Sequence, residues 1–132
     1  MSKSVFMLED DSDDRFFTSE TLEEIGVTIP VRFFTGSNDL FAALSAGHKP
    51  SLILVDYNAT PEDGLQVLKK LKGHALYKDV PVVILSDNDL SFYRSECYAN
   101  GASSFVKKPT SLEGTKQKIS AFFKYWLEVA EV

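Results

Sequence analysis

Five short apolar runs, separated by segments of helical period, constrain the fold of this chain more than any other feature. The runs lie at 4–8, 31–35, 52–55, 82–85 and 103–107. Short continuous apolar runs are typical of strands buried on both faces of a parallel sheet. The segments between them space apolar residues three and four apart, which is typical of helices with one buried face. The alternation predicts an α/β fold, a doubly wound five-stranded parallel sheet covered by five helices and joined by right-handed crossovers.

Capping signals indicate where several of the predicted helices begin and end. Asp11 is a candidate N-cap for a first helix that Gly26 ends. Asp63 and Gln66, three residues apart, form a capping box for a helix that ends at Gly73. The second helix is predicted to end near residue 47, and the fourth to span about 89–100. The last helix is predicted to follow Pro109 and to begin with a second capping box, made by Thr110 and Glu113.

The last predicted helix carries a stripe of large apolar side chains. Their spacing alternates between three residues and one, which puts them on one face of a helix. We therefore predict that this face packs against the core, and a ligand-binding aromatic box is the alternative interpretation. The stripe consists of Ile119, Phe122, Phe123, Trp126 and Leu127.

Length, charge and cysteine content narrow the class of protein. A chain of 132 residues suffices for one domain with a core, so we expect a single domain over 1–132 without an output domain. The net charge of -5 argues against nonspecific nucleic-acid binding. No apolar run approaches the roughly 20 residues of a membrane span, and the start does not resemble a signal peptide. The single cysteine, Cys97, favours a reducing, cytoplasmic setting and is expected to pack inside the fourth helix.

Polar residues follow four of the apolar runs, where the carboxyl ends of the strands are expected. In a doubly wound sheet these ends form the edge at which ligands bind. Residues far apart in sequence are therefore predicted to meet at one site. They are Glu9, Asp10 and Asp11 after the first run, Asp56 after the third, Ser86 after the fourth, Lys107 at the end of the fifth and Lys108 directly after it.

The chemistry of this set favours phosphoryl transfer with a divalent cation. Clustered carboxylates raise one another's pKa values, and Mg²⁺ or a lysine offsets that repulsion. Positioned positive charge also stabilises a phosphoryl group in transit. Asp56, at the end of the most apolar run, is the natural nucleophile. For the acidic segment 9–14 a solvated helix start is the alternative, and Asp11 fits a helix cap better than a third metal ligand.

In order and spacing, these motifs resemble those of response-regulator receiver domains of the CheY-like superfamily, of the single-domain, stand-alone type. Each motif alone is weak, but together they extend over more than a hundred residues. The resemblance implies a flavodoxin-like sheet with the strand order 2-1-3-4-5. The motifs that carry it are Glu9-Asp10-Asp11, Val55-Asp56, Asp63-Gly64, Ser86 and Lys108-Pro109.

The resemblance also implies a role for individual residues at the metal side of the site. Asp56 matches the phosphoacceptor and also a ligand of Mg²⁺. Asp10 matches the more direct acidic ligand, and Glu9 one that acts largely through water. Asn58 matches the position whose backbone carbonyl completes the protein ligands of the metal.

A second group of residues matches the phosphoryl side and the switch. Ser86 matches the hydroxyl that bonds a phosphoryl oxygen, and Lys108 matches the lysine that pairs with the phosphoryl group. The Lys108–Pro109 bond is cis in the family. Phe105 matches the aromatic switch residue, which turns inward when the Ser86 position moves, and its lack of a hydroxyl implies a switch that works by packing.

The function implied by the resemblance is that of a response regulator in a two-component phosphorelay. A sensor histidine kinase or a histidine phosphotransfer protein would donate the phosphoryl group from phosphohistidine to Asp56. The face made by the fourth helix, fifth strand and fifth helix would then bind a downstream protein. Such a domain catalyses only its own phosphorylation and dephosphorylation, as a monomer or a weak homodimer, without nucleic-acid or membrane partners.

Several positions bear on how the family pattern would operate here. Pro61 stands five residues after Asp56, whereas the family commonly has proline at the fourth, so a different turn is expected there. The charge of Asp87, at a commonly small position, would slow phosphotransfer or exclude small-molecule donors by repulsion. Asn58 and Asn88 stand where the family modulates the lifetime of the phosphoryl group.

Two alternatives to a phosphorylated receiver stay open at the level of sequence. One is a pseudo-receiver, a binding module that has the fold without the phosphorylation. The other is a haloacid-dehalogenase-type phosphatase, which Asp56-x-Asn58-x-Thr60 faintly resembles. That class needs a carboxylate as general acid at the position where this chain has Asn58. Because an amide cannot donate a proton in that way, Asn58 argues against the phosphatase.

Overall fold

The computed structural model describes residues 3–87, 91–108 and 112–129. Strands and helices alternate along the chain, as the sequence predicts. The strands are β1 (Val5–Leu8), β2 (Val31–Phe34), β3 (Leu52–Asp56), β4 (Val82–Ser86) and β5 (Ser104–Lys107). The helices are α1 (Ser12–Glu24), α2 (Ser37–Ser45), α3 (Gly64–Lys72), α4 (Ser91–Ala99) and α5 (Leu112–Lys124), which continues as a π-helical segment η1 (Tyr125–Val129).

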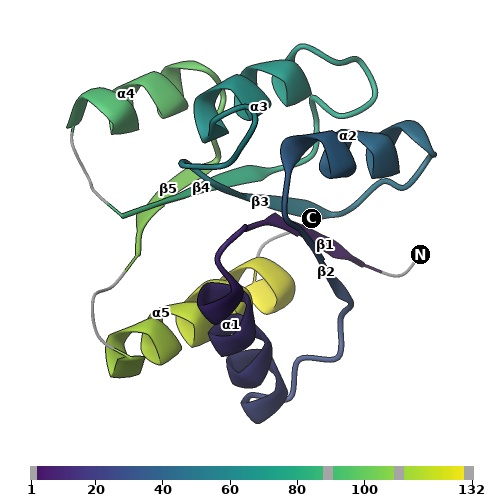
Figure 1. Cartoon of the computed structure of the whole chain (residues 1–132). Coiled ribbons are helices and arrows are strands. Elements are labelled where there is room, and N and C mark those ends of the chain that lie inside the picture. Colours follow the sequence, from purple (N-terminus) through teal and green to yellow (C-terminus); the bar gives the residue numbers. More distant parts are fainter. Residues whose placement is uncertain (1–2, 88–90, 109–111, 130–132) are drawn as a thin grey trace.

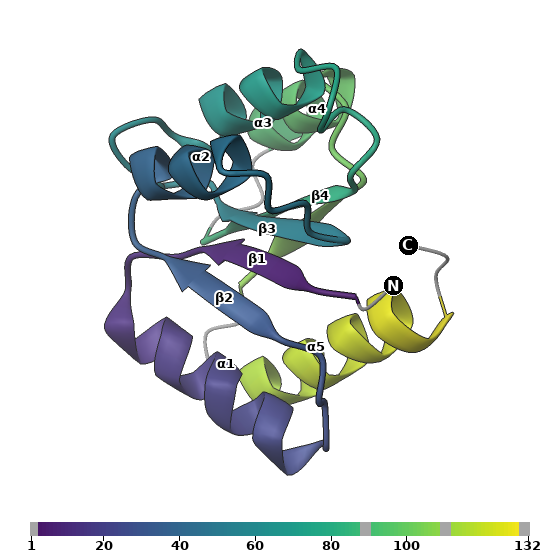
Figure 2. The same ribbon diagram turned by 90° about the vertical axis from the view of Figure 1, so that its right-hand side faces the viewer.

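The five strands form one parallel sheet in the order β2-β1-β3-β4-β5, which confirms the predicted topology. Helices α1 and α5 cover one face of the sheet, and α2, α3 and α4 cover the other (Figures 1 and 2). None of the described helices combines the length and the apolar composition that a membrane span requires.

Each face of the sheet packs into its own hydrophobic core, because successive strand residues point to opposite faces. On β3, Ile53 and Val55 belong to the core beneath α2, α3 and α4. Leu52 and Leu54 belong to the core beneath α1 and α5. Every residue of β3 is buried, and burial of each apolar side chain contributes about 1.5–3 kcal/mol. Asp56 therefore ends a strand that is fixed on both sides.

The capping signals near the site have the predicted structural outcome. Asp11 is the N-cap of α1, and its Oδ1 accepts hydrogen bonds from the backbone N–H groups of Asp13 and Asp14. Asp63 and Gln66 form the predicted capping box at the start of α3. The predicted capping box at Thr110 and the start of the fourth helix near residue 89 lie outside the described residues.

The apolar stripe of the last helix faces the core beneath α1 and α5, as predicted. Phe123 and Leu127 are buried, and Ile119, Phe122 and Trp126 pack against the same core. The sequence does not predict the change from α-helix to π-helix at Tyr125. The wider turn still leaves Trp126 and Leu127 against the core.

Cys97 provides a probe of global unfolding. Its side chain is fully buried in α4, as predicted, and burial together with the charges of Asp63 and Glu96 raises the pKa of the thiol to about 11. A buried, protonated thiol does not react with disulfide reagents. We expect the native protein not to react with Ellman's reagent at mildly alkaline pH, and to react with one equivalent once urea unfolds it. Rapid labelling of the native protein would contradict this burial.

Candidate functional site

The predicted site residues meet at the carboxyl edge of the sheet. Glu9 directly follows β1, Asp56 ends β3, Ser86 ends β4, and Lys108 directly follows β5. Glu9, Asp56 and Ser86 are at most 4% exposed, so three polar side chains are buried beside the core. Because burying a polar group is costly unless it is paired, these buried side chains require hydrogen-bonding or charged partners at this edge of the sheet.

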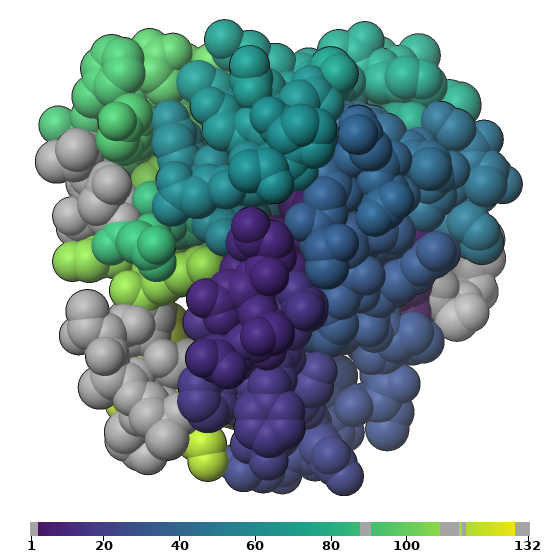
Figure 3. Space-filling view, viewed as in Figure 1, coloured from purple at the N-terminus to yellow at the C-terminus, as the bar shows by residue number. Residues whose placement is uncertain are grey.

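The carboxylates of Glu9, Asp10 and Asp56 form a candidate metal site. One oxygen from each residue lies within 4.8 Å of the other two. Glu9 and Asp56 are buried and Asp10 is exposed, so the cluster has a closed side and an open side. In Figure 3 the segment that follows β1, coloured purple, lies at the surface of the molecule that faces the viewer. Carboxylate oxygens with access to water fit Mg²⁺, which prefers oxygen ligands and keeps several waters.

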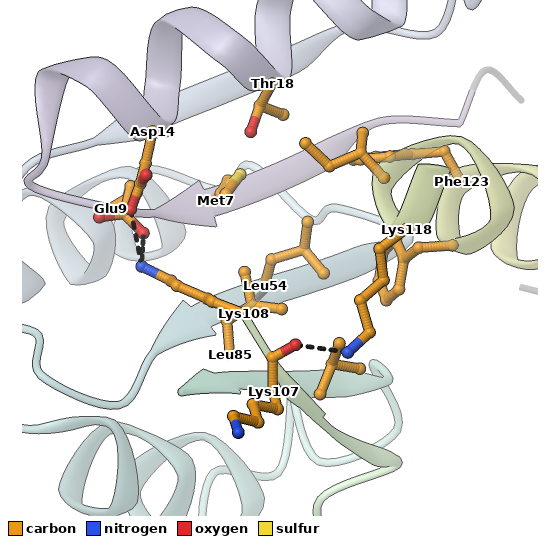
Figure 4. A pocket seen from close by; sticks show the side chains of 13 residues that line it. Met7, Glu9, Asp14, Thr18, Leu54, Leu85, Lys107, Lys108, Lys118 and Phe123 are labelled. Carbon is orange, nitrogen blue, oxygen red and sulfur yellow. Dashed lines mark hydrogen bonds and ion pairs between the residues drawn. The ribbon is translucent and has the colours of Figure 1, made fainter. Parts of the chain in front are cut away.

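Lys108 places a positive charge among these acids. Its Nζ lies 2.8 Å from Glu9 Oε2, 3.0 Å from Asp14 Oδ2 and 3.4 Å from Asp56 Oδ2. Figure 4 shows Lys108 with the first two of these partners. Burial alone would lower the pKa of Lys108, but its carboxylate partners, Glu9 first, raise it above its usual range. Lys108 is therefore an ammonium, and it offsets part of the repulsion among the acids.

Glu9 is the acid most perturbed by its surroundings. Burial raises the pKa of Glu9 from 4.5 to about 7, the charge of Asp56 adds to the increase, and the hydrogen bond from Lys108 opposes it. Glu9 Oε1 also accepts a hydrogen bond from the backbone N–H of Asp11 at 3.1 Å. The ionised form of Glu9 thus depends on nearby positive charge, which a bound divalent cation would increase.

The backbone holds Ser86 and Lys108 next to each other. The backbone N–H of Lys108 donates to the carbonyl oxygen of Ser86 at 2.7 Å, which continues the β4–β5 pairing by one residue past the strand ends. The Lys108 side chain therefore starts at the edge of the sheet and reaches across to Glu9. The two residues predicted to bind phosphoryl oxygens are in this way brought together.

The loop after Asp56 is closed by backbone hydrogen bonds. Asp56 Oδ1 accepts from the backbone N–H of Asn58 at 3.2 Å, and the Tyr57 carbonyl accepts from the N–H of Gly64 at 2.8 Å. The Thr60–Pro61 peptide is cis, which is the form that the shifted proline takes in this loop. The hydrogen bond from its backbone N–H holds Asn58 beside Asp56.

Gly64 permits this loop to pack against the start of α3. A Cβ atom at Gly64 would lie 2.7 Å from Tyr57 Cα, closer than real Cβ contacts, and 3.0 Å from the Asp56 carbonyl oxygen, which is a tight contact. Because both neighbours are backbone atoms, we expect Gly64→Ala to lower the free energy of unfolding by at least about 2 kcal/mol. Urea denaturation measures this loss.

Gly36 supplies the matched control for that substitution, because it also stands at the start of a helix. Among the described residues, a Cβ there would meet only the Thr60 carbonyl oxygen at 3.5 Å, an ordinary contact. Gly36→Ala should cost about 1 kcal/mol or less, the usual effect of alanine at an N-cap. Equal losses in the two variants would contradict the proposed clash.

Phe105 and Asp87 are two further predicted site residues that the structure describes. The ring of Phe105 is half-buried and packs against the core beneath α2, α3 and α4. Asp87 is exposed directly after β4. Asn88 and the Lys108–Pro109 bond lie outside the described residues.

Two contacts at the site were missed by sequence reasoning. Asp14 pairs with Lys108, although the sequence does not distinguish it from Asp13, which stands in the same first turn of α1. The hydroxyl of Tyr98 accepts a hydrogen bond from the backbone N–H of Phe105 at 3.1 Å and so links α4 to β5. No sequence motif predicts the Tyr98 contact, because it depends on how α4 packs against β5, the edge strand.

The fold and the site together define a parallel α/β protein with an acidic, lysine-containing pocket at the carboxyl edge of its sheet. The family model for the response regulator receiver domain matches residues 5–120. The chain therefore belongs to the response-regulator receiver family, whose members act in two-component signal transduction and are in general signalling modules rather than enzymes.

Similar proteins place the chain within this family. The two-component response regulator ARR17 of Arabidopsis thaliana is 38% identical over 69 residues, which are 52% of this chain and 45% of ARR17. The phosphorylated cyanobacterial phytochrome response regulator RcpA is 26% identical with a TM-score of 0.91, over 99% of this chain and 98% of RcpA. The Mn²⁺-bound form of response regulator Rcp1 has the same fold, with 22% identity and a TM-score of 0.91, over 98% of each chain. The chain spans less than half the length of ARR17 and of other plant response regulators it matches.

Proposed function

We propose that this receiver accepts a phosphoryl group on Asp56 from a phosphohistidine, with Mg²⁺ held by Glu9, Asp10 and Asp56. The observation that carries the proposal is the convergence at one edge of the sheet. A buried carboxylate, Asp56, lies 3.4 Å from the Lys108 ammonium and within 4.8 Å of two further carboxylates. RcpA was crystallised phosphorylated and Rcp1 with Mn²⁺, which supports the same chemistry here.

The proposed reaction transfers one phosphoryl group between two side chains. An Asp56 carboxylate oxygen attacks phosphorus, the P–N bond to the donor histidine breaks, and an aspartyl-phosphate forms. Lys108 and the Ser86 hydroxyl then bind phosphoryl oxygens, and the backbone hydrogen bond between these two residues supports a joint role. Bound Mg²⁺ supplies positive charge against the phosphoryl oxygens.

The phosphoryl group would change the contacts of Lys108 and Ser86, and we propose that Phe105 moves with them. The face of α4, β5 and α5 would then present a different surface to a downstream protein. The Tyr98 hydroxyl is part of this face, since it bonds the backbone of Phe105. We further propose that 1–132 is one receiver domain, that it is a monomer or a weak homodimer, and that it acts in the reducing cytoplasm that its single cysteine favours.

The test is transfer from a phosphorylated histidine kinase, followed by intact mass. A phytochrome-type kinase is a suitable first donor, since RcpA is a phytochrome response regulator. We expect a gain of one phosphoryl group that requires Mg²⁺ and is lost on chelation with EDTA. Peptide mapping after borohydride reduction should place the modification on Asp56. No gain from several donors, together with no response to Mg²⁺ or beryllofluoride, would favour the pseudo-receiver.

A further inference from the structure

The Lys108 ammonium is shared among three carboxylates, of which one has no part in the candidate metal site. Glu9 and Asp56 belong to the cluster that fits Mg²⁺, whereas Asp14 does not. Asp14 Oδ2 nevertheless lies 3.0 Å from Lys108 Nζ, closer than the 3.4 Å between Lys108 and Asp56 Oδ2. This ion pair is the one described contact of the Asp14 carboxylate. Asp14 can therefore affect the site through Lys108.

The start of α1 explains why Asp14 reaches the site. The Asp11 cap fixes the first turn by accepting from the N–H groups of Asp13 and Asp14. Helical side chains lean toward the N-terminus of their helix, which here is the end that adjoins the carboxyl edge of the sheet. Figure 4 shows Asp14 and Glu9 together at the ammonium end of Lys108.

The surroundings of the Lys108 stem leave it room to move. A cavity of about 90 Å³ lies between the sheet, α1 and α5, and Lys108, Asp14 and Glu9 line it together with apolar side chains such as Leu54 and Phe123 (Figure 4). An aliphatic stem beside open apolar space can change its rotamer without displacing backbone. The position of the ammonium is therefore set mainly by which carboxylates attract it.

We propose that Asp14 is a positioning residue that holds Lys108 in the unphosphorylated state and competes with the phosphoryl group on Asp56 for its ammonium. This inference rests on the proposed function, because it concerns the same lysine. An ammonium has three N–H donors, and each one given to Asp14 is withheld from a phosphoryl oxygen. The Asp14 side chain is 41% exposed, so solvent screens the pair and its removal should shift an equilibrium about two- to fivefold.

The first arm of the test measures the coupling between the two residues in the metal-free protein. Asp14→Asn should lower the folding equilibrium constant of the wild type about two- to fivefold. In a Lys108→Met background, the same substitution should have no such effect, because the partner charge is absent. Equal effects in both backgrounds would overturn the proposed pairing, whatever the protein does with phosphate.

The second arm measures affinity for beryllofluoride, a phosphoryl mimic, with Mg²⁺ present. Asp14→Asn should bind it about two- to fivefold more tightly than the wild type, and the gain should shrink at high salt. The control is Asp13→Asn, which removes the same charge from the neighbouring exposed position and should leave the affinity unchanged. Equal affinities for Asp14→Asn and wild type, or equal gains in both variants, would overturn the inference. A wild type that does not bind beryllofluoride would instead contradict the proposed function.

Discussion

Asp56→Asn is expected to abolish phosphoryl acceptance while leaving the fold intact. An amide is too weak a nucleophile to form the acyl phosphate, and the change also removes one of the three carboxylates of the candidate metal site. The loss of transfer should be complete within detection, because Asp56 is the proposed site of bond formation. Intact mass after incubation with a phosphorylated kinase measures it directly.

The stability of the same variant should not fall. Asp56 raises the pKa of Glu9 through charge repulsion, so removal of this charge relieves a buried conflict. We expect an unchanged or slightly larger free energy of unfolding, and weaker Mg²⁺ binding. Asp39→Asn is the matched control, since Asp39 is exposed in the first turn of α2, and it should accept the phosphoryl group normally. Phosphorylation that persists in Asp56→Asn would place the acceptor elsewhere.

Lys108→Met should produce the largest loss of stability among the site variants. Methionine keeps much of the apolar stem but leaves Glu9, which is fully buried, without its hydrogen-bonded cation. We expect a loss of about 3 kcal/mol in the metal-free protein, at the lower end of the range for a broken buried pair because Lys108 is partly exposed. Mg²⁺ should restore part of the loss by supplying positive charge at the same carboxylates.

The pH dependence of that loss follows from the pKa of Glu9. Its folded value of about 7 exceeds the ordinary 4.5, so the folded state binds more protons than the unfolded state between these values. The contribution of Glu9 to the stability of the metal-free protein therefore decreases as pH rises through this window. Lys108→Met removes a hydrogen bond that lowers this pKa, so its effect should be largest at neutral pH and smaller near about pH 5.

Urea denaturation across this pH range, with and without Mg²⁺, measures both effects. Lys107→Met is the control, because Lys107 is the exposed neighbour and its side chain makes no described contact with the acids. It should change stability by about 0.5 kcal/mol or less, as surface substitutions usually do. A similar loss in the two variants would show that Lys108 does not stabilise the carboxylates.

Much of the fold could be predicted because its central strands have a clear apolar pattern in the sequence. The runs at β3 and β4 are apolar at nearly every position, which identifies strands buried on both faces. The Asp63 capping box and the left-handed Gly26 and Gly101 mark element ends by local backbone chemistry. Once the strands are known, the topology of a doubly wound sheet brings their polar ends together, and this placed Asp56 and Lys108 at one edge.

The parts that could not be predicted depend on side-chain direction and on packing between distant elements. The pairing of Asp14 with Lys108 requires both the phase of α1 and the rotamer of a lysine 94 residues away. The Tyr98–Phe105 hydrogen bond depends on the position of α4 against β5. The π-helical turn at Tyr125 has no local signal comparable to a proline or glycine, since the segment YWLEV suits an α-helix equally well.

Strand β5 lies at one border of the sheet, and two side chains occupy backbone groups on its free side. The Tyr98 hydroxyl accepts from the N–H of Phe105, and Lys118 Nζ donates to the carbonyl oxygen of Lys107 at 2.5 Å. An edge with two of its hydrogen-bonding groups occupied is a poorer template for an added strand. Two copies of this chain could not extend their sheets into one another through β5 without first breaking both bonds, so the edge is protected against strand-mediated aggregation.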